Sequence, residues 1–354
     1  YDDVLVAAYN ADPGSVRDAG QVYVIFGSAS RFQSEIQLAS LNGTAGFILN
    51  GALEDGSLGF AMSSAGDVNG DGISDLILSA YKANTQKGRT YVIFGTRAGF
   101  TSPMSVSSLD GTIGFAMDGV SSYDNAGISV SSVGDVNGDG IGDIVLGAWY
   151  VKVRGRSKVG QAYVVFGSRA RFPSVLQLSS LNGTSGFTIN GIGSNDQTGK
   201  SVSSAGDLNH DGIDDIVIGA WLSRPGDIVN GGQVFVIFGT ASGFDAVFEL
   251  SSLDGSNGFV LQGANEDDAA GMSVSHPGDV NGDGISDLFI GGYFASVGET
   301  IGKVYVLFGS EAEFPRAISL SSLNGRNGFL FSGVTADEWQ RLAGGPVGDI
   351  NGDG

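Results

Sequence analysis

Asp67-Val68-Asn69-Gly70-Asp71-Gly72-Ile73-Ser74-Asp75 is the stretch that decides the fold. Oxygen-bearing side chains stand at positions 1, 3, 5 and 9 of this loop, and the glycine at position 6 permits a sharp turn. The same D-x-N-x-D-G-x-x-D pattern begins again at Asp135, Asp207 and Asp279. A fifth copy is split across the chain ends: Asp349–Gly354 gives positions 1 to 6, and Tyr1–Asp3 gives the last three.

These loops divide the chain into repeats of about 71 residues. The repeat phases are 67–134, 135–206, 207–278, 279–348, and 349–354 joined to 1–66. Because one repeat fills the whole length, we expect a single domain, 1–354, rather than two or three unrelated ones. The first and the last residue of the chain fall at adjacent positions of the repeat. This predicts either an array of repeats or a closed ring.

Each repeat contains four short strands. In one repeat these are residues 127–132, 143–148, 161–167 and 186–191, bounded by glycines or by the acidic loop. The 59 glycines and 7 prolines of the chain fit many tight turns between strands. The sequence therefore predicts an all-β protein.

The composition of the strands favours a β-propeller of four-stranded blades. The third strands, such as 162–166 and 234–238, are apolar at nearly every position, so both of their faces should be buried. The first strands, such as 201–206, are rich in serine, glycine and alanine, which suits the narrow centre where blades converge. We predict a closed ring of five blades.

The acidic loops have the chemistry of a calcium site. Carboxylate and amide oxygens at positions 1, 3, 5 and 9, with a backbone carbonyl at position 7, suit a hard cation of flexible coordination. The alternative is a cluster of Asx-turns without an ion. We expect about one Ca2+ per repeat, held by Asp67, Asn69, Asp71, Ile73 and Asp75; Asp135, Asn137, Asp139, Ile141 and Asp143; Asp207, Asn209, Asp211, Ile213 and Asp215; Asp279, Asn281, Asp283, Ile285 and Asp287; and Asp349, Asn351, Asp353, Tyr1 and Asp3.

The overall charge and composition exclude several functions. Three aspartates in each of five loops account for much of the net charge of −20, and such a surface makes nucleic acid an unlikely partner. There is no cysteine for a thiolate site, and no apolar stretch long enough to span a membrane. Neither His210 nor His276 has a serine and a carboxylate in a catalytic pattern, so we expect no enzyme.

The loop followed by an apolar strand such as Asp143-Ile144-Val145-Leu146-Gly147-Ala148 resembles the FG-GAP repeats of the integrin α-subunit propeller and of many bacterial surface proteins. The resemblance covers essentially the whole chain. It implies that each repeat is a blade, that calcium lies in the hairpin between the first two strands, and that the domain serves adhesion or scaffolding outside the cell or at its surface. Integrin propellers have seven blades, so membership of a seven-bladed propeller is the alternative to a ring of five.

One departure from the family motif marks a candidate ligand face. The proline after the second strand is replaced by an aromatic residue in every repeat: Tyr9, Tyr81, Trp149, Trp221 and Tyr293. These rings either stack on sugar rings or wedge between neighbouring blades. Asn42-Gly43-Thr44 and Asn182-Gly183-Thr184 match the N-glycosylation acceptor, although a tight turn is the simpler explanation of Asn-Gly.

The sequence thus predicts a calcium-stabilised adhesion or structural propeller with a protein or glycan partner at the cell surface. A carbohydrate-binding lectin and a polysaccharide-cleaving propeller enzyme are the second and third interpretations. The split fifth loop adds a hypothesis: Asp349, Asn351 and Asp353 join Asp3 either within one chain, closing the ring, or between chains that assemble head to tail.

Overall fold

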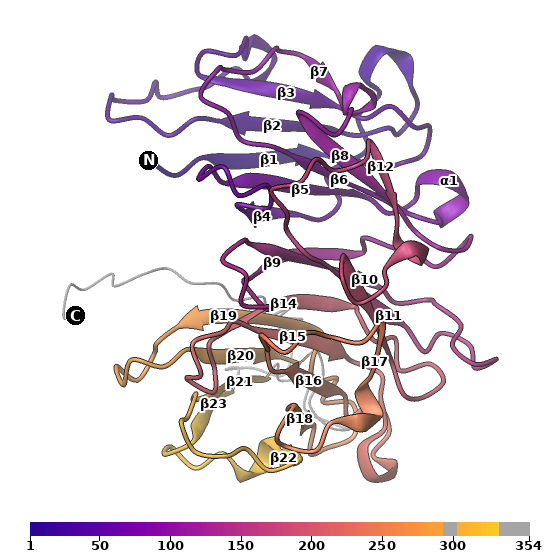
Figure 1. The fold of residues 1–354 in the computed structure, drawn as a ribbon, viewed down its shortest axis with the longest axis vertical. Helices are drawn as coiled ribbons and strands as arrows, with labels where there is room; N and C mark the ends of the chain where they lie inside the picture. Colours follow the sequence, from indigo (N-terminus) through magenta and orange to yellow (C-terminus); the bar gives the residue numbers. More distant parts are fainter. Residues whose placement is uncertain (293–302, 333–354) are drawn as a thin grey trace. The chain divides into compact units, whose positions relative to one another are not determined.

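The computed structural model describes residues 1–292 and 303–332, and within them the chain is all-β (Figure 1). It divides into two compact units, Tyr1–Val130 with Ser168–Ser180, and Ser131–Gly167 with Leu181–Gly354. Five sheets follow one another along the sequence, each built on neighbouring antiparallel strands. The predicted β-propeller fold class, with blades as its repeating unit, is confirmed.

The first unit holds two sheets. Their strands, in spatial order, are β1 (Val4–Ala8), β2 (Gln21–Ile25), β3 (Gly46–Asn50) and β7 (Met104–Ser105), and then β4 (Met62–Gly66), β5 (Asp75–Ala80), β6 (Arg89–Ile93), β8 (Gly114–Asp118) and β12 (Val175–Gln177). Its helical turns are η1 (Pro13–Ser15), η2 (Leu38–Ser40), α1 (Ala83–Gln86), η3 (Val106–Ser108) and η4 (Leu178–Ser180).

The other three sheets belong largely to the second unit. Their strands are β9 (Ser129–Gly134), β10 (Asp143–Ala148), β11 (Gln161–Val165), β13 (Gly186–Asn190) and β17 (Val247–Glu249); β14 (Ser201–Gly206), β15 (Asp215–Ala220), β16 (Gln233–Ile237), β18 (Gly258–Gln262) and β22 (Ala317–Ser319); and β19 (Ser273–Gly278), β20 (Asp287–Gly291), β21 (Lys303–Leu307) and β23 (Gly328–Ser332). Short 3-10 turns lie at η5 (Pro225–Asp227), η6 (Leu250–Ser252) and η7 (Leu320–Ser322).

Burial follows the predicted order of strands. Every residue of β10 and of β15 is buried, and the third strands β11 and β16 are buried except at their first residue. Their side chains form two continuous apolar clusters, one including Val145 and Phe187, the other Val217 and Phe259. Both faces of these strands are covered by other side chains. This burial explains why the strands are apolar at nearly every position of the sequence.

A bulge at the end of the first strand leads into the acidic loop in three of the sheets. The ladder between β4 and β5 shifts register between Ser64 and Gly66, and the one between β14 and β15 shifts between Ser204 and Gly206. Gly66 and Gly206 have φ of 72° and 64°, which an L side chain rarely adopts. The bulge therefore ends strand pairing and starts the loop.

The linker between the third and fourth strands contains a strand that the sequence analysis did not predict. β7, β12, β17 and β22 lie in these linkers, and each pairs in parallel with the fourth strand of the sheet that precedes it in sequence. For example, Leu176 lies opposite Met117, and Ile318 lies opposite Leu261. Four of the sheets therefore gain an outer strand from the next repeat.

A phenylalanine at the start of each of these four linkers reinforces the pairing. Its ring stacks on a phenylalanine in the fourth strand of the preceding sheet, with centroids 4.1 to 4.4 Å apart and planes within 9° of parallel. We call the residues from this ring to the end of the short strand the latch segment. The latch segments are 100–105, 172–177, 244–249 and 314–319.

Candidate metal loops

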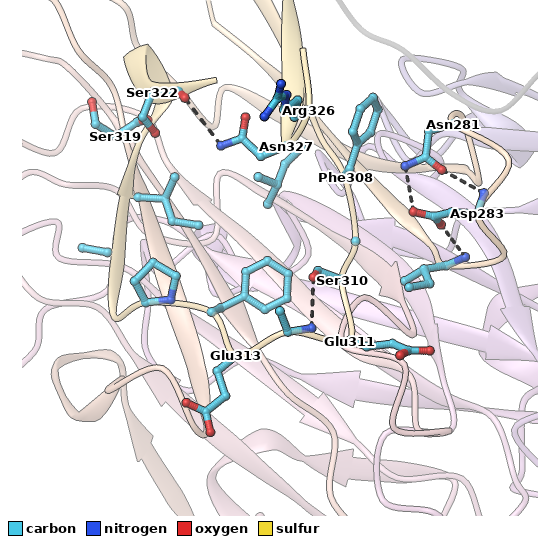
Figure 2. Close-up of a pocket in the computed structure, with 18 residues that line it drawn as sticks. Asn281, Asp283, Phe308, Ser310, Glu311, Glu313, Ser319, Ser322, Arg326 and Asn327 are labelled. Carbon is cyan, nitrogen blue, oxygen red and sulfur yellow. Dashed lines mark hydrogen bonds between the residues drawn. The ribbon is translucent and has the colours of Figure 1, made fainter. Parts of the chain in front are cut away.

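The four described acidic loops join the first strand to the second in their sheets, as predicted. They share one side of the sheet with the linkers between the third and fourth strands. Figure 2 shows Asn281 and Asp283 of one loop beside Phe308, Ser310 and Glu311 of the linker. Together they line a cavity of about 800 Å³, and Asp211 borders a similar cavity of about 610 Å³ in the preceding sheet.

Backbone amides hold the side chains at positions 1, 3 and 5 in one arrangement in all four loops. In the first loop the Asp71 N–H donates to Asp67 Oδ1 and to Asn69 Oδ1, both at 2.9 Å. The Gly72 N–H donates to Asp67 Oδ2 at 2.8 Å. The same bonds recur around Asp135, Asp207 and Asp279. The backbone of the loop therefore forms a turn that holds these side-chain oxygen atoms in place.

The aspartate at position 9 is buried and accepts two amides. Asp143 takes the Val136 N–H at 3.0 Å and the Gly167 N–H at 2.8 Å, and Asp75, Asp215 and Asp287 make the equivalent pair of bonds. Gly167 follows the third strand, so this carboxylate joins the loop to the rest of its sheet. The sequence analysis missed this glycine partner, although Phe-Gly recurs at the end of every third strand.

The pKa values of these carboxyls are raised. Burial raises the pKa of Asp75 to about 6 and the pKa values of Asp143 and Asp215 to about 8, although two amides act in the opposite direction. The negative charges of the aspartates at positions 1 and 5 raise the pKa of each further. A cation bound nearby would stabilise the charged carboxylates and would therefore lower these pKa values.

The donor set fits a hard cation. Among the described residues, no carboxylate of these loops forms an ion pair. The same residues contain no group of three His, Cys, Asp or Glu side chains arranged as a ready metal cluster. The three carboxylates of a loop are therefore not brought together here, although with an amide oxygen and a backbone carbonyl they are the types of ligand that calcium takes.

Part of the split fifth loop is also described. The Gly27 N–H donates to Asp3 Oδ1 at 2.8 Å, which is the bond that Gly95 makes to Asp75 in the first loop. Asp3 thus has one of the two bonds expected of position 9. Tyr1 is exposed, whereas Asp349, Asn351 and Asp353 lie outside the described residues.

The aromatic residues after the second strands contact other protein side chains. Tyr9 packs edge-on against Phe60, which lies just before β4 of the next sheet, and the ring of Tyr81 lies 4.2 Å from the same Phe60. The Lys200 ammonium lies 4.3 Å over the ring of Trp149, and Trp221 Nε1 donates to Gln197. These contacts favour a wedge between blades over sugar stacking, while Tyr293 lies outside the described residues.

A second set of acids is buried, whereas the sequence favoured solvated turns at these positions. Asp124, Asp196 and Asp268 lie in the connections between repeats and accept amide N–H bonds from Ser121, Gly193 and Asn265, respectively. Burial raises the pKa values of Asp124 and Asp196, whereas Lys303 pairs with Asp268 at 3.0 Å. A D-x-x-G spacing at Asp124, Asp196 and Asp268, shortly before a first strand, was the available signal.

Asn42 and Asn182 are exposed, and each accepts a backbone N–H from the threonine two residues later. This is the tight turn foreseen for Asn-Gly, and glycosylation at the two sites stays a prediction. In the described part of the chain, no helix has both the length and the apolar character needed to cross a membrane.

Three segments of the chain match the FG-GAP repeat family model: residues 60–93, 126–165 and 198–237. Each match spans a first strand, its acidic loop and the next two strands. These are the parts of the repeat that carry the candidate ligands.

Curated proteins with related sequences include integrin alpha-5 of Xenopus laevis, 27% identical over 68% of this chain and 20% of that protein. Integrin alpha-V of Gallus gallus is 26% identical over 68% of this chain and 20% of its own length. Phosphatidylinositol-glycan-specific phospholipase D of Bos taurus is 31% identical over 50% of this chain and 19% of its own. The chain therefore spans about a fifth of the length of these relatives.

Proposed function

We propose that this chain, which carries FG-GAP repeats, is a calcium-stabilised adhesion or scaffolding module that acts outside the cell or at its surface. The observation that carries the proposal is the loop geometry, repeated four times, in which backbone amides hold the oxygen donors and no loop carboxylate forms an ion pair among the described residues. Similarity to integrin α subunits over two thirds of the chain supports the adhesive role.

In the first loop, Asp67, Asn69, Asp71 and Asp75 would hold the ion with the Ile73 carbonyl, and the equivalent residues would serve in the other loops. The bound ion supplies positive charge that balances three carboxylates. The chain's own amides keep the side chains in place, and the aspartate at position 9 ties the loop to the glycine after the third strand. Ion binding would therefore stabilise the whole sheet.

Calorimetric titration of the metal-free chain with calcium tests this role. We expect about one ion per intact loop, and Asp207→Ala should remove one of them. Asp245→Ala is the matched control, because Asp245 is an exposed acid outside the loops. Titration without heat or saturation, or an unchanged stoichiometry in Asp207→Ala, would contradict the proposal.

The adhesive role is tested separately. Surfaces coated with the chain should retain cells in calcium and lose them in chelator, whereas retention no better than on inert albumin would argue against adhesion. We propose no catalytic role, so neither a phosphatidylinositol-glycan nor an acidic polysaccharide should be hydrolysed. The first of these substrates is included because one relative is named as a phospholipase D.

Carbohydrate binding remains the second candidate because the aromatic residue recurs after each second strand. A glycan array distinguishes it from protein adhesion. Binding that disappears in Trp149→Ala and Trp221→Ala would favour the lectin, and a blank array would exclude it.

A further inference from the structure

A cluster of basic side chains lies in the connection between β10 and β11. Residues 151–160, which we call the basic hairpin, contain no acid and four cations: Lys152, Arg154, Arg156 and Lys158. The corresponding connections carry one arginine with two aspartates (10–20), two lysines (82–88), and one arginine with one aspartate (222–232). Among these four connections the excess of positive charge is therefore largest here, in a chain whose net charge is −20.

Main-chain contacts give the basic hairpin a defined conformation. Val153 and Arg156 exchange two hydrogen bonds, at 3.1 and 2.9 Å. Arg154 and Gly155, which lie between them, have φ of 50° and 83°, as a two-residue turn of type I′ requires. Three valines of the hairpin are buried: Val151, Val153 and Val159. The four basic side chains are exposed, so the anchored backbone holds them at the surface.

The connection that precedes β14 supports the hairpin along one side. Three of its amides donate to consecutive carbonyls of the hairpin at 3.0 to 3.1 Å: Asn195 to Ser157, Gln197 to Lys158 and Thr198 to Val159. Both segments belong to the second compact unit. The arrangement of the cations is therefore a property of that unit alone.

Two aromatic rings place ammonium groups beside the hairpin. The Lys158 ammonium lies 4.9 Å over the ring of Tyr150, and the Lys200 ammonium lies 4.3 Å over the ring of Trp149. The two rings contact each other edge-on, with centroids 4.8 Å apart. Because a ring attracts a cation over its face, these contacts restrict the positions of both ammonium groups.

Few acidic side chains oppose the cations of the hairpin. Glu249 accepts Arg154 at 2.9 Å and also accepts the side-chain amide of Asn190. Asp196, which is buried, lies near enough to Arg156 to interact with its charge. In the described part of the chain, no carboxylate forms an ion pair with the other three cations of the hairpin. The exposed surface of the hairpin thus keeps a positive excess.

The acidic loops lie at the opposite ends of the strands. β10 begins at Asp143, the last position of its acidic loop, and ends at Ala148, directly before Trp149. At about 3.3 Å per residue, the strand separates its two ends by about 16 Å. Interactions between exposed charges are largely screened beyond about 8 Å at physiological ionic strength. The basic hairpin therefore acts as a positive surface despite the net charge of the chain.

We propose that the basic hairpin binds a linear polysaccharide that carries sulfate or carboxylate groups. The guanidinium groups of Arg154 and Arg156 can each donate two parallel N–H bonds to such a group, and Lys152 and Lys158 add point charges. The site recognises charge rather than a sugar ring, and it contains none of the candidate metal ligands. It therefore goes beyond the proposed function.

A polysaccharide fits this surface better than other polyanions. A thin chain can contact the hairpin alone, whereas a flat anionic membrane or a nucleic-acid duplex would also meet the acids elsewhere on the chain. A single-stranded nucleic acid binds through aromatic rings on which its bases stack. The rings of Trp149 and Tyr150 contact each other and hold ammonium groups instead.

Binding of the full chain to immobilised polysaccharides tests the proposal. The probes are heparin, which carries sulfate and carboxylate groups, hyaluronate, which carries carboxylate alone, and uncharged dextran. The wild type should bind heparin or hyaluronate but not dextran, and the affinity should fall as salt rises, because binding releases counterions. Binding to heparin alone would assign sulfate as the recognised group, and binding to both would assign carboxylate as sufficient.

Lys152→Gln with Arg156→Gln is the test variant, because both side chains are exposed and neither forms an ion pair in the part of the chain that is described. Its affinity for the bound polysaccharide should fall about tenfold or more, with a shallower salt dependence. Arg31→Gln with Arg97→Gln is the matched control, since it removes the same charge from exposed positions outside the hairpin. The control should bind within about twofold of the wild type, and both variants should keep the wild-type melt.

Three results would overturn the proposal. The first is a wild type that binds neither charged polysaccharide at low salt. The second is an equal loss of affinity in the two double variants, which would show that charge anywhere on the surface suffices. The third is tighter binding to single-stranded oligothymidylate than to either polysaccharide, which would assign the hairpin to nucleic acid.

Discussion

The buried aspartate at position 9 has a structural role that is independent of any ion. Asp143 accepts amides from Val136 and Gly167, and an asparagine could accept only one of them. We expect Asp143→Asn to lower the free energy of unfolding by about 2 kcal/mol even in chelator, because one of the two buried N–H groups loses its acceptor. Urea denaturation in chelator measures this loss.

Asp139→Asn is the matched control, since Asp139 is exposed at position 5 of the same loop. It should cost little in chelator and show its effect only when calcium is present. Equal losses for the two variants in chelator would contradict the distinction.

The Arg89–Asp118 pair predicts a pH dependence of stability. Burial acts to raise the pKa of Asp118, but the hydrogen bonds and charge of Arg89 outweigh it and hold that pKa below its ordinary value. The pair therefore stabilises the fold above the ordinary pKa of an aspartate, about 3.9, and this contribution is lost as the pH falls through the lower folded-state pKa.

Another sheet has a neutral amide pair, Gln161 and Asn190, at the equivalent positions. Arg89→Gln with Asp118→Asn copies this pair. The difference in unfolding free energy between this variant and the wild type should shrink as the pH falls from 6 to 3, as measured by urea denaturation. A difference that stays constant over this range would count against the ion pair.

At this scale the loops that carry the candidate ligands could be predicted, because the pattern that defines them lies within nine residues. Their amide partners after the third strand were not predictable, because Gly95 lies 20 residues from Asp75 and meets it only when the sheet forms. The buried acids Asp124, Asp196 and Asp268 were missed for a similar reason: an acid in a loop is usually solvated.

The latch segments explain how neighbouring elements hold together. Phe244 stacks on Phe187 at 4.2 Å, so Phe244→Ala should remove about 3 kcal/mol of unfolding free energy. Phe32→Ala should change it by less than about 0.5 kcal/mol, because Phe32 is exposed. Thermal denaturation of the two variants in parallel makes the comparison, and equal effects would argue against a stabilising role for the stacked ring of Phe244.

The four strands of each blade were predictable because each has a local apolar pattern and a glycine boundary. The latch strands were not, because a strand of two or three residues has too few positions to show a period of two. Val175–Gln177 becomes a strand only because β8 of the preceding sheet offers it an edge.

At the scale of the molecule, calcium should determine thermal stability. An ion at one hundred times its Kd adds about 2.7 kcal/mol per site, and 1 kcal/mol moves Tm by about 2–4 °C in units of this size. We therefore expect a chelator to lower Tm by at least about 5 °C and added calcium to restore it, as measured by calorimetry. An unchanged melt would argue against ion binding in the folded state.

The number and order of the sheets followed from the repeat, because each repeat builds most of its own sheet. The number of blades in a ring does not follow in the same way. Ring size depends on a small rotation between neighbours, and nearly identical repeats satisfy the same local contacts at several ring sizes.

The borrowed outer strand also sets the timing of folding during synthesis. The sheet that contains Asp118 receives its last strand from Gln177, 59 residues later, and the sheet that contains Asn190 waits equally long for Glu249. At about 5–20 residues per second, a ribosome needs about 3–12 s to cover that distance. Throughout that interval each newly made sheet has an open edge, so a pause in translation within a linker would prolong the period in which nascent chains can aggregate.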